Sequence, residues 1–228
     1  MDATTDEPAI LPDRPRTDAR RPIALIAGVV ATVLFVVLRL AVDLDGGAPL
    51  AFDQWWDDAM AALADPVAVI VAWIPATVGG TVGMIVIGIS TTIVFLLVKR
   101  PWDALNVAAS IALVVLIGAP LAAVIARARP MDSLAETQAT SFPSGHTAVA
   151  TTIAVTLALI LRRGWIWAAG AVWVLLMMWS RTYLHAHWLS DVTAGFLEGV
   201  AVATLVWAFI EVWRARRAQR LVAASAER

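Results

Sequence analysis

Two short polar segments of this chain carry the side chains that could do chemistry. The first, residues 180–191, reads SRTYLHAHWLSD and places Arg181, His187 and Asp191 between two apolar runs. His187 and Asp191 are four residues apart, so on a helix they would share a face, and the carboxylate could accept from one ring nitrogen. The other nitrogen would stay available as a nucleophile or base. Because the guanidinium of Arg181 suits phosphate, the segment predicts half of a phosphoryl-transfer site.

The second segment, residues 141–146, reads SFPSGH and is expected to open a helix. Proline suits a first helical turn, and Gly145 allows the backbone to approach a ligand closely. Free N–H groups at a helix N-terminus bind phosphate oxygens, and Ser144 adds a hydroxyl. His146 could protonate a leaving oxygen. The segment is therefore the expected second half of the site.

Two arginines precede this segment, at the end of an apolar run. Arg129 is the better candidate for binding phosphate, because Pro130 fixes the chain directly after it. Arg127 is interpreted mainly as an interfacial arginine, with at most an auxiliary role at the site.

Two other ionisable residues have open roles. Glu198 follows Asp191 by seven residues and is expected on the same helix face, where a buried acid is costly and suggests function. It could equally be protonated and hydrogen-bonded inside the bundle. His185 lies two residues before His187, is expected to point elsewhere, and is interpreted as non-catalytic.

The composition indicates that helices in a membrane position these residues. Of 228 residues, 60% are hydrophobic and 15% are charged, whereas soluble domains are about a quarter charged. A net charge of −1 gives no indication of a nucleic-acid partner, and the absence of cysteine excludes disulfides and thiolate metal sites. No metal site or cofactor is expected.

The predicted fold is all-α: a six-span transmembrane bundle with an interfacial amphipathic helix between the first two spans. The predicted spans are 22–42, 81–98, 103–126, 146–161, 165–179 and 188–213. The interfacial helix is expected within residues 43–66, where tryptophans recur at helical spacing beside many aspartates. In the sixth span, a GxxxG pattern at Gly195 and Gly199 predicts close helix packing.

Clusters of arginine and lysine set the expected orientation. They lie in the N-terminal region, at 99–100, at 162–163 and near the C-terminus, and the positive-inside rule makes all four cytoplasmic. The candidate site then faces the extracytoplasmic side of a cell membrane. The expected parts are a disordered cytoplasmic tail (1–21), the six-helix domain (22–214) and a basic cytoplasmic tail (215–228).

Taken together, these segments resemble the three motifs of the type 2 phosphatidic acid phosphatase superfamily, which includes the vanadium haloperoxidases. The matching residues are Arg129-Pro130, Pro143-Ser144-Gly145-His146, and Ser180-Arg181 with His187 and Asp191. The resemblance implies a metal-independent phosphatase acting on a lipid phosphate: polyprenyl diphosphate, phosphatidylglycerophosphate or phosphatidic acid.

The resemblance also implies a role for each residue. His187 would be the nucleophile that forms a phosphohistidine, Asp191 its orienting partner, and His146 the acid for the leaving group. The phosphoryl oxygens would be held by Arg129, Ser144, Gly145 and Arg181.

One position departs from the family pattern. The first motif of the family begins with a lysine seven residues before the arginine of Arg-Pro, and here that residue is Ala122. On a continuous helix Ala122 would lie two turns beneath Arg129, and Arg127 could compensate for the missing charge. Two alternatives stay open: a phosphotransferase that passes the phosphoryl group to another acceptor, and a weakly active or non-catalytic lipid-binding relative.

Overall fold

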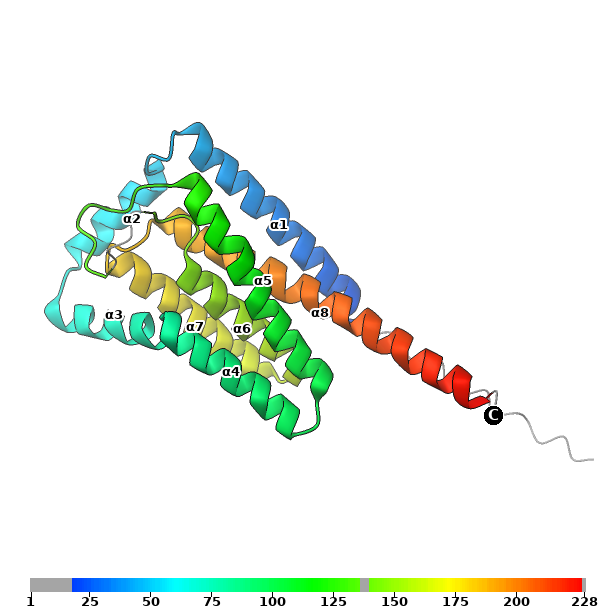
Figure 1. The fold of residues 1–228 in the computed structure, drawn as a ribbon. Coiled ribbons are helices and arrows are strands. Elements are labelled where there is room, and N and C mark those ends of the chain that lie inside the picture. The colour runs from blue at the N-terminus through cyan, green and yellow to red at the C-terminus, as the bar shows by residue number, and fades with distance from the viewer. Residues whose placement is uncertain (1–17, 136–139, 227–228) are drawn as a thin grey trace, which may run out of the picture.

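The computed structural model describes residues 18–135 and 140–226, and within them helices joined by loops form the fold (Figure 1). The expected tail at 1–21 therefore lies largely outside the described residues. The helices are α1 (Arg21–Leu44), α2 (Ala51–Ala62), α3 (Pro66–Val78), α4 (Thr81–Leu97), α5 (Pro101–Ile125), α6 (Gly145–Leu161), α7 (Gly164–Tyr183) and α8 (Leu189–Ala226). Extended pairing in the described part is limited to one isolated bridge between Ala128 and Thr140. The all-α prediction is confirmed.

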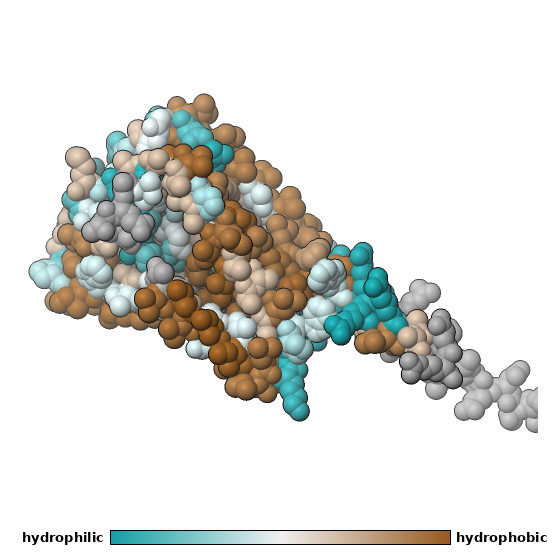
Figure 2. Space-filling view, in the orientation of Figure 1, coloured by the Kyte–Doolittle hydropathy of each residue, from teal (hydrophilic) through white to brown (hydrophobic). Residues whose placement is uncertain are grey.

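Three of the described helices, α1, α5 and α8, are each long and apolar enough to cross a membrane. A fourth span is possible if α3 and α4, which meet at a 47° bend, are one broken span. In Figure 2, apolar side chains cover α1, α4 and α5, and hydrophilic ones gather where α8 extends beyond the other helices. These features are those of a multi-pass membrane protein, and the count of six spans stays a prediction.

Helix bounds differ from expectation mainly around the polar segments. The fifth predicted span was placed at 165–179, but α7 continues to Tyr183 and so includes Arg181. The third was placed at 103–126, and α5 ends at Ile125, where Ala126 adopts a left-handed conformation. At the C-terminus, α8 continues through most of the expected basic tail (Figure 1).

The contact between α6 and α8 depends on two glycines. A Cβ at Gly195 would collide with the carbonyl oxygen of Ser144, and one at Gly199 would lie 2.6 Å from that of Ala148. Because both residues lack a side chain, the α8 backbone lies directly against α6. The predicted packing role of the GxxxG pattern is confirmed.

This packing brings the starts of α6 and α8 together. The backbone N–H of Ser144 donates to the carbonyl oxygen of Asp191 at 3.0 Å. The two polar segments of the sequence, about forty residues apart, therefore meet at one end of the bundle.

We expect Gly195→Ala to lower the stability of the fold by about 1–3 kcal/mol, since the added methyl group must push α6 and α8 apart. Gly164→Ala is the matched control, because a Cβ there meets nothing within 4 Å. Thermal unfolding of the two variants in detergent measures the difference. Equal melting temperatures would contradict the packing role.

Candidate functional site

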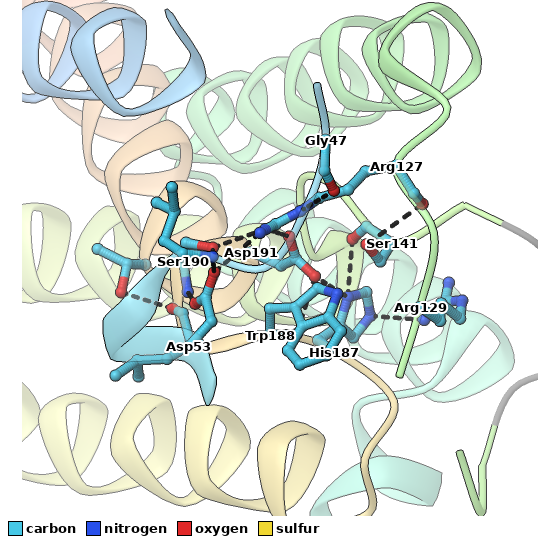
Figure 3. A network of polar contacts seen from close by, with 12 residues as sticks. Gly47, Asp53, Arg127, Arg129, Ser141, His187, Trp188, Ser190 and Asp191 are labelled. Carbon is cyan, nitrogen blue, oxygen red and sulfur yellow. Dashed lines mark hydrogen bonds and ion pairs between the residues drawn. The ribbon is translucent and has the colours of Figure 1, made fainter. Parts of the chain in front are cut away.

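Arg127 is the centre of a buried polar network beneath the loops (Figure 3). Its guanidinium forms ion pairs with Asp53 at 2.8 Å and Asp191 at 2.6 Å, and all three side chains are fully buried. It also donates to Ser190 Oγ and to two backbone carbonyls, those of Gly47 and Ala48. The network joins the loop after α1, helix α2, the loop after α5 and the start of α8.

This network changes the interpretation of Arg127. A guanidinium has five N–H donors, and the five contacts, to Gly47, Ala48, Asp53, Ser190 and Asp191, use all of them. Arg127 therefore has no donor left for a phosphate. The expectation that it serves as an auxiliary phosphate ligand or compensates for Ala122 is wrong, and its role is structural.

His187 is oriented by a backbone carbonyl. Its Nδ1 lies 2.8 Å from the carbonyl oxygen of Ser141, and its Nε2 lies 3.2 Å from Nη1 of Arg129 (Figure 3). The carbonyl can only accept and the guanidinium can only donate. The network therefore assigns the proton to Nδ1 and leaves a lone pair on Nε2.

Asp191 acts on the His187 ring less directly than the four-residue spacing between them suggested. The nearest approach of its carboxylate to His187 Nδ1 is 3.7 Å, which is longer than a hydrogen bond. The carboxylate instead accepts from the Trp188 N–H at 2.9 Å and from Arg127. The expected direct orientation of the ring by Asp191 is corrected: Ser141 holds the ring, and Asp191 fixes the turn and adds a nearby negative charge.

Arg181 supports the same turn from the end of α7. Its carbonyl oxygen accepts from the N–H groups of Ala186 and His187, and its side chain is buried. Burial lowers the pKa of the His187 imidazole from its ordinary value, and the neighbouring Arg181 and Arg129 guanidiniums lower it further, against the opposing effect of Asp191. Burial and the two guanidiniums therefore favour the neutral form of the ring.

A cavity of about 420 Å³ opens beside these residues. Its polar end is lined by Arg129, Gly145, His146 and His187, which come from three separate segments of the chain. A Cβ at Gly145 would meet nothing within 4 Å, so the first residue of α6 faces open space. The amide N–H groups of the first turn of α6, together with cationic side chains, make this end of the cavity suited to an anion.

Ala122 and Glu198 line the deeper part of the same cavity. Because α5 ends at Ile125, Ala122 does not lie two helical turns beneath Arg129 on one helix face, and that expectation is wrong. Ala122 and Arg129 instead line the same cavity from two different segments, helix α5 and the loop that follows it. Glu198 is 4% exposed, and both of its carboxyl oxygens lack a hydrogen-bond partner in the described part of the chain.

His185 belongs to a different cluster, outside this cavity. Its Nδ1 lies 2.7 Å from Asp57 and 3.5 Å from Asp132. The three side chains bring one potential metal ligand each within 4.8 Å of one another. Burial raises the pKa of the Asp57 carboxyl, against the effect of His185. None of these residues lines the cavity that contains His187, in agreement with a non-catalytic role for His185.

The family model described as "PAP2 superfamily" matches residues 103–215, which include every residue of the cavity's polar end. The chain belongs to the PAP2 superfamily. Undecaprenyl-diphosphatase from Sulfolobus acidocaldarius is 42% identical over 65 residues, which are 28% of this chain and 31% of that protein. The match therefore spans less than a third of that relative.

Two solved structures share the fold of this PAP2 protein. The transmembrane PAP2-type phosphatidylglycerolphosphate phosphatase of Bacillus subtilis superposes with a TM-score of 0.69 at 22% identity, over 80% of this chain and 95% of that one. LpxE of Aquifex aeolicus gives a TM-score of 0.61 at 22% identity, over 69% and 96%. At this identity the likeness concerns the fold.

Two residues of the network in this PAP2 protein were missed from the sequence. Asp53 was recognised only as one of many aspartates in an interfacial helix, and nothing in its spacing points to Arg127, 74 residues away. Ser141 contributes a backbone carbonyl, which carries no residue-type signal. Its position as the first residue of the polar segment 141–146 was the available hint.

We expect Arg127→Lys to destabilise the protein by about 2–4 kcal/mol, because an ammonium cannot supply five donors in a planar fork and leaves buried acceptors unpaired. Arg39→Lys is the matched control: Arg39 pairs with Asp43 at 3.3 Å, and both side chains are over a third exposed. Such a pair contributes little. Melting temperatures in detergent test this, and similar losses in both variants would argue against the network.

Proposed function

We propose that this PAP2 protein is a metal-independent membrane phosphatase that removes a phosphoryl group from a lipid phosphate through a phosphohistidine. The carrying observation is the His187 ring, which lines a cavity shared with His146 and Arg129 and is held through Nδ1, so that its acceptor nitrogen Nε2 lies 3.2 Å from Nη1 of Arg129. A neutral imidazole held by its Nδ1 proton is a prepared nucleophile. Membership of the PAP2 superfamily supports the same reaction class.

The proposed reaction has two steps. In the first, His187 Nε2 attacks phosphorus, the bond from phosphorus to the lipid oxygen breaks, and His146 gives its proton to that oxygen. In the second, His146 takes a proton from water, the water oxygen attacks phosphorus, and the P–N bond breaks to release phosphate. Both histidines return to their starting states.

Charge stabilisation is assigned to groups around the polar end of the cavity. Arg129 and Arg181 supply permanent positive charge, and Ser144 and the Gly145 amide supply donors at the start of α6. Phosphoryl transfer depends chiefly on positioning and on dispersed positive charge. Since Arg127 is fully engaged elsewhere, we propose that this set works without a replacement for the lysine absent at Ala122.

The proposed substrates are polyprenyl diphosphate, phosphatidylglycerophosphate and phosphatidic acid. Two are supported by the activities named for proteins that this chain resembles, an undecaprenyl-diphosphatase and a phosphatidylglycerolphosphate phosphatase. The apolar walls of the cavity, formed by side chains such as Ile111, Val114 and Val149, suit a lipid tail.

We also propose six spans, with α2 at the interface, both termini in the cytoplasm and the site on the extracytoplasmic face. The support is that the arginine-rich segments lie at one end of the helix bundle and the polar cavity residues lie at the other end. The apolar exposed faces of α1, α4 and α5 are consistent with lipid contact (Figure 2).

We expect phosphate release from undecaprenyl diphosphate or phosphatidic acid in detergent to persist with excess chelator and to fall at least about a thousandfold in His187→Ala. His185→Ala is the control, because it removes a nearby imidazole outside the cavity. Addition of alcohol acceptors separates hydrolysis from phosphotransfer. A strict requirement for Mg²⁺, or full activity in His187→Ala, would falsify the mechanism.

We expect the acidic limb of the kcat/KM profile to have its midpoint below pH 6.5, after correction for ionisation of the substrate. The neutral ring is the nucleophile, and a lowered pKa for His187 keeps it neutral as the pH falls through its ordinary value. Arg129→Gln should move the midpoint upward by removing one positive neighbour. A midpoint above 6.5 in the wild type would contradict the assignment.

A further inference from the structure

The inner part of the cavity holds a carboxyl group that the proposed reaction does not use. Glu198 is 4% exposed, and neither of its oxygens has a hydrogen-bond partner within residues 18–135 and 140–226. A buried polar group without a partner is costly in any protein and more so in an apolar bundle. The carboxyl lines the cavity that contains His146 and His187, so a bound molecule can supply the missing partner.

The depth of Glu198 follows from the packing of α8 on α6. Gly199, its neighbour, lies against Ala148, and Ala148 follows His146 by two residues. Glu198 is therefore about one helical turn, roughly 5 Å, beneath His146. Side chains lean toward the N-terminus of their helix, and the N-terminus of α8 is at the polar end, so the carboxyl leans back toward that end.

The wall opposite Glu198 is made of small residues of α5. A Cβ at Gly118 would lie 3.1 Å from Glu198 Oε1, and Ala122 lies one turn closer to the polar end of the cavity. The missing side chain at Gly118 accommodates the carboxyl itself, the small side chain of Ala122 borders the cavity next to it, and the other walls of this part of the cavity are apolar. A ligand group placed here meets one hydrogen-bonding side chain in an otherwise hydrocarbon environment.

We infer that Glu198 is a specificity-determining residue: it accepts a hydrogen bond from a hydroxyl or ammonium group that the lipid carries a few bonds from the phosphorus. Both a carboxyl and a carboxylate can accept such a bond, so the recognition holds in either state. A lipid phosphate that is pure hydrocarbon at this depth leaves the buried oxygens unpaired and binds less well. This inference rests on the proposed function and narrows its substrate class.

The test compares lipid phosphates that differ by one donor. The probes are oleoyl lysophosphatidic acid, which has a free hydroxyl, its 2-deoxy analogue, which has none, and sphingosine 1-phosphate, which adds an ammonium. We expect the wild type to prefer the donor-bearing probes by about tenfold or more in kcat/KM, mainly through KM. Lysophosphatidic acid tests recognition of a hydroxyl alone, and a further gain with sphingosine 1-phosphate, which carries both a hydroxyl and an ammonium, reports recognition of the ammonium.

Variants at the same position identify the group responsible. Glu198→Leu should reduce the preference to within about twofold, because the donor-bearing probes lose the hydrogen bond and the 2-deoxy probe no longer leaves buried carboxyl oxygens unpaired. Glu198→Gln, which keeps an acceptor oxygen, should retain part of the preference. Glu211→Gln is the control, since Glu211 is on the same helix and outside the cavity. Equal losses on all probes in Glu198→Leu, or no preference in the wild type, would overturn the inference. If the protein releases phosphate from none of the three probes, the proposed function is refuted instead.

A second measurement does not depend on activity. Lysine at position 122 would lean along α5 toward Gly118 and offer a tethered ammonium to Glu198. We expect Ala122→Lys to be tolerated in the wild-type background and to lower the melting temperature by several degrees more when combined with Glu198→Leu. Strictly additive shifts would show that the carboxyl does not accept a donor in this space, and would overturn the inference even for an inactive protein.

Discussion

The ion cluster of Arg127, Asp53 and Asp191 is the constraint on which the rest of the site depends. Three charges lie fully out of solvent, and the removal of such groups from water is costly unless each is paired and hydrogen-bonded. Here the geometry is complete, because every donor of the guanidinium has an acceptor. The cluster therefore tolerates only one arrangement of the four segments that meet there, and we interpret it as a device for specificity of structure rather than for stability.

A short series of direct contacts connects this ion cluster to the His187 ring and fixes the position of the ring. Asp191 holds both Arg127 and the Trp188 N–H, which fixes the turn before α8. The Ser141 carbonyl then fixes the ring through Nδ1. Backbone contact between α6 and α8 at Gly195 keeps the two helix starts in register. A nucleophile placed in this way needs little reorganisation during a reaction, which is a large part of what preorganised sites contribute.

The two buried acids of α8 illustrate opposite solutions to the same electrostatic problem. Asp191, at the first turn, accepts from one protein donor on each of its oxygens and so is a permanent part of the scaffold. Glu198, two turns deeper, has no such partner in the described chain and faces the cavity. The carboxylate of Asp191 fixes the site, whereas the carboxyl of Glu198 offers acceptor oxygens to which a ligand can donate a hydrogen bond. Their seven-residue spacing puts both on the side of α8 that faces the bundle interior.

The sequence by itself determined the helical class, the two polar segments, and the residue types at the polar end of the cavity. These features are local: apolar runs of span length, a helix start at Ser144-Gly145-His146, and a histidine near an arginine and an aspartate. Only the tertiary structure decided which partners these residues have. Arg127 became a structural centre because Asp53, far away in the chain, folds against it. Likewise, the His187 ring is held by a carbonyl rather than by Asp191, and the end of α5 at Ile125 removes Arg129 from the helix that carries Ala122. Pairings of this kind depend on contacts between distant segments, and neither residue spacing nor composition encodes the distance between two such segments once the chain has folded.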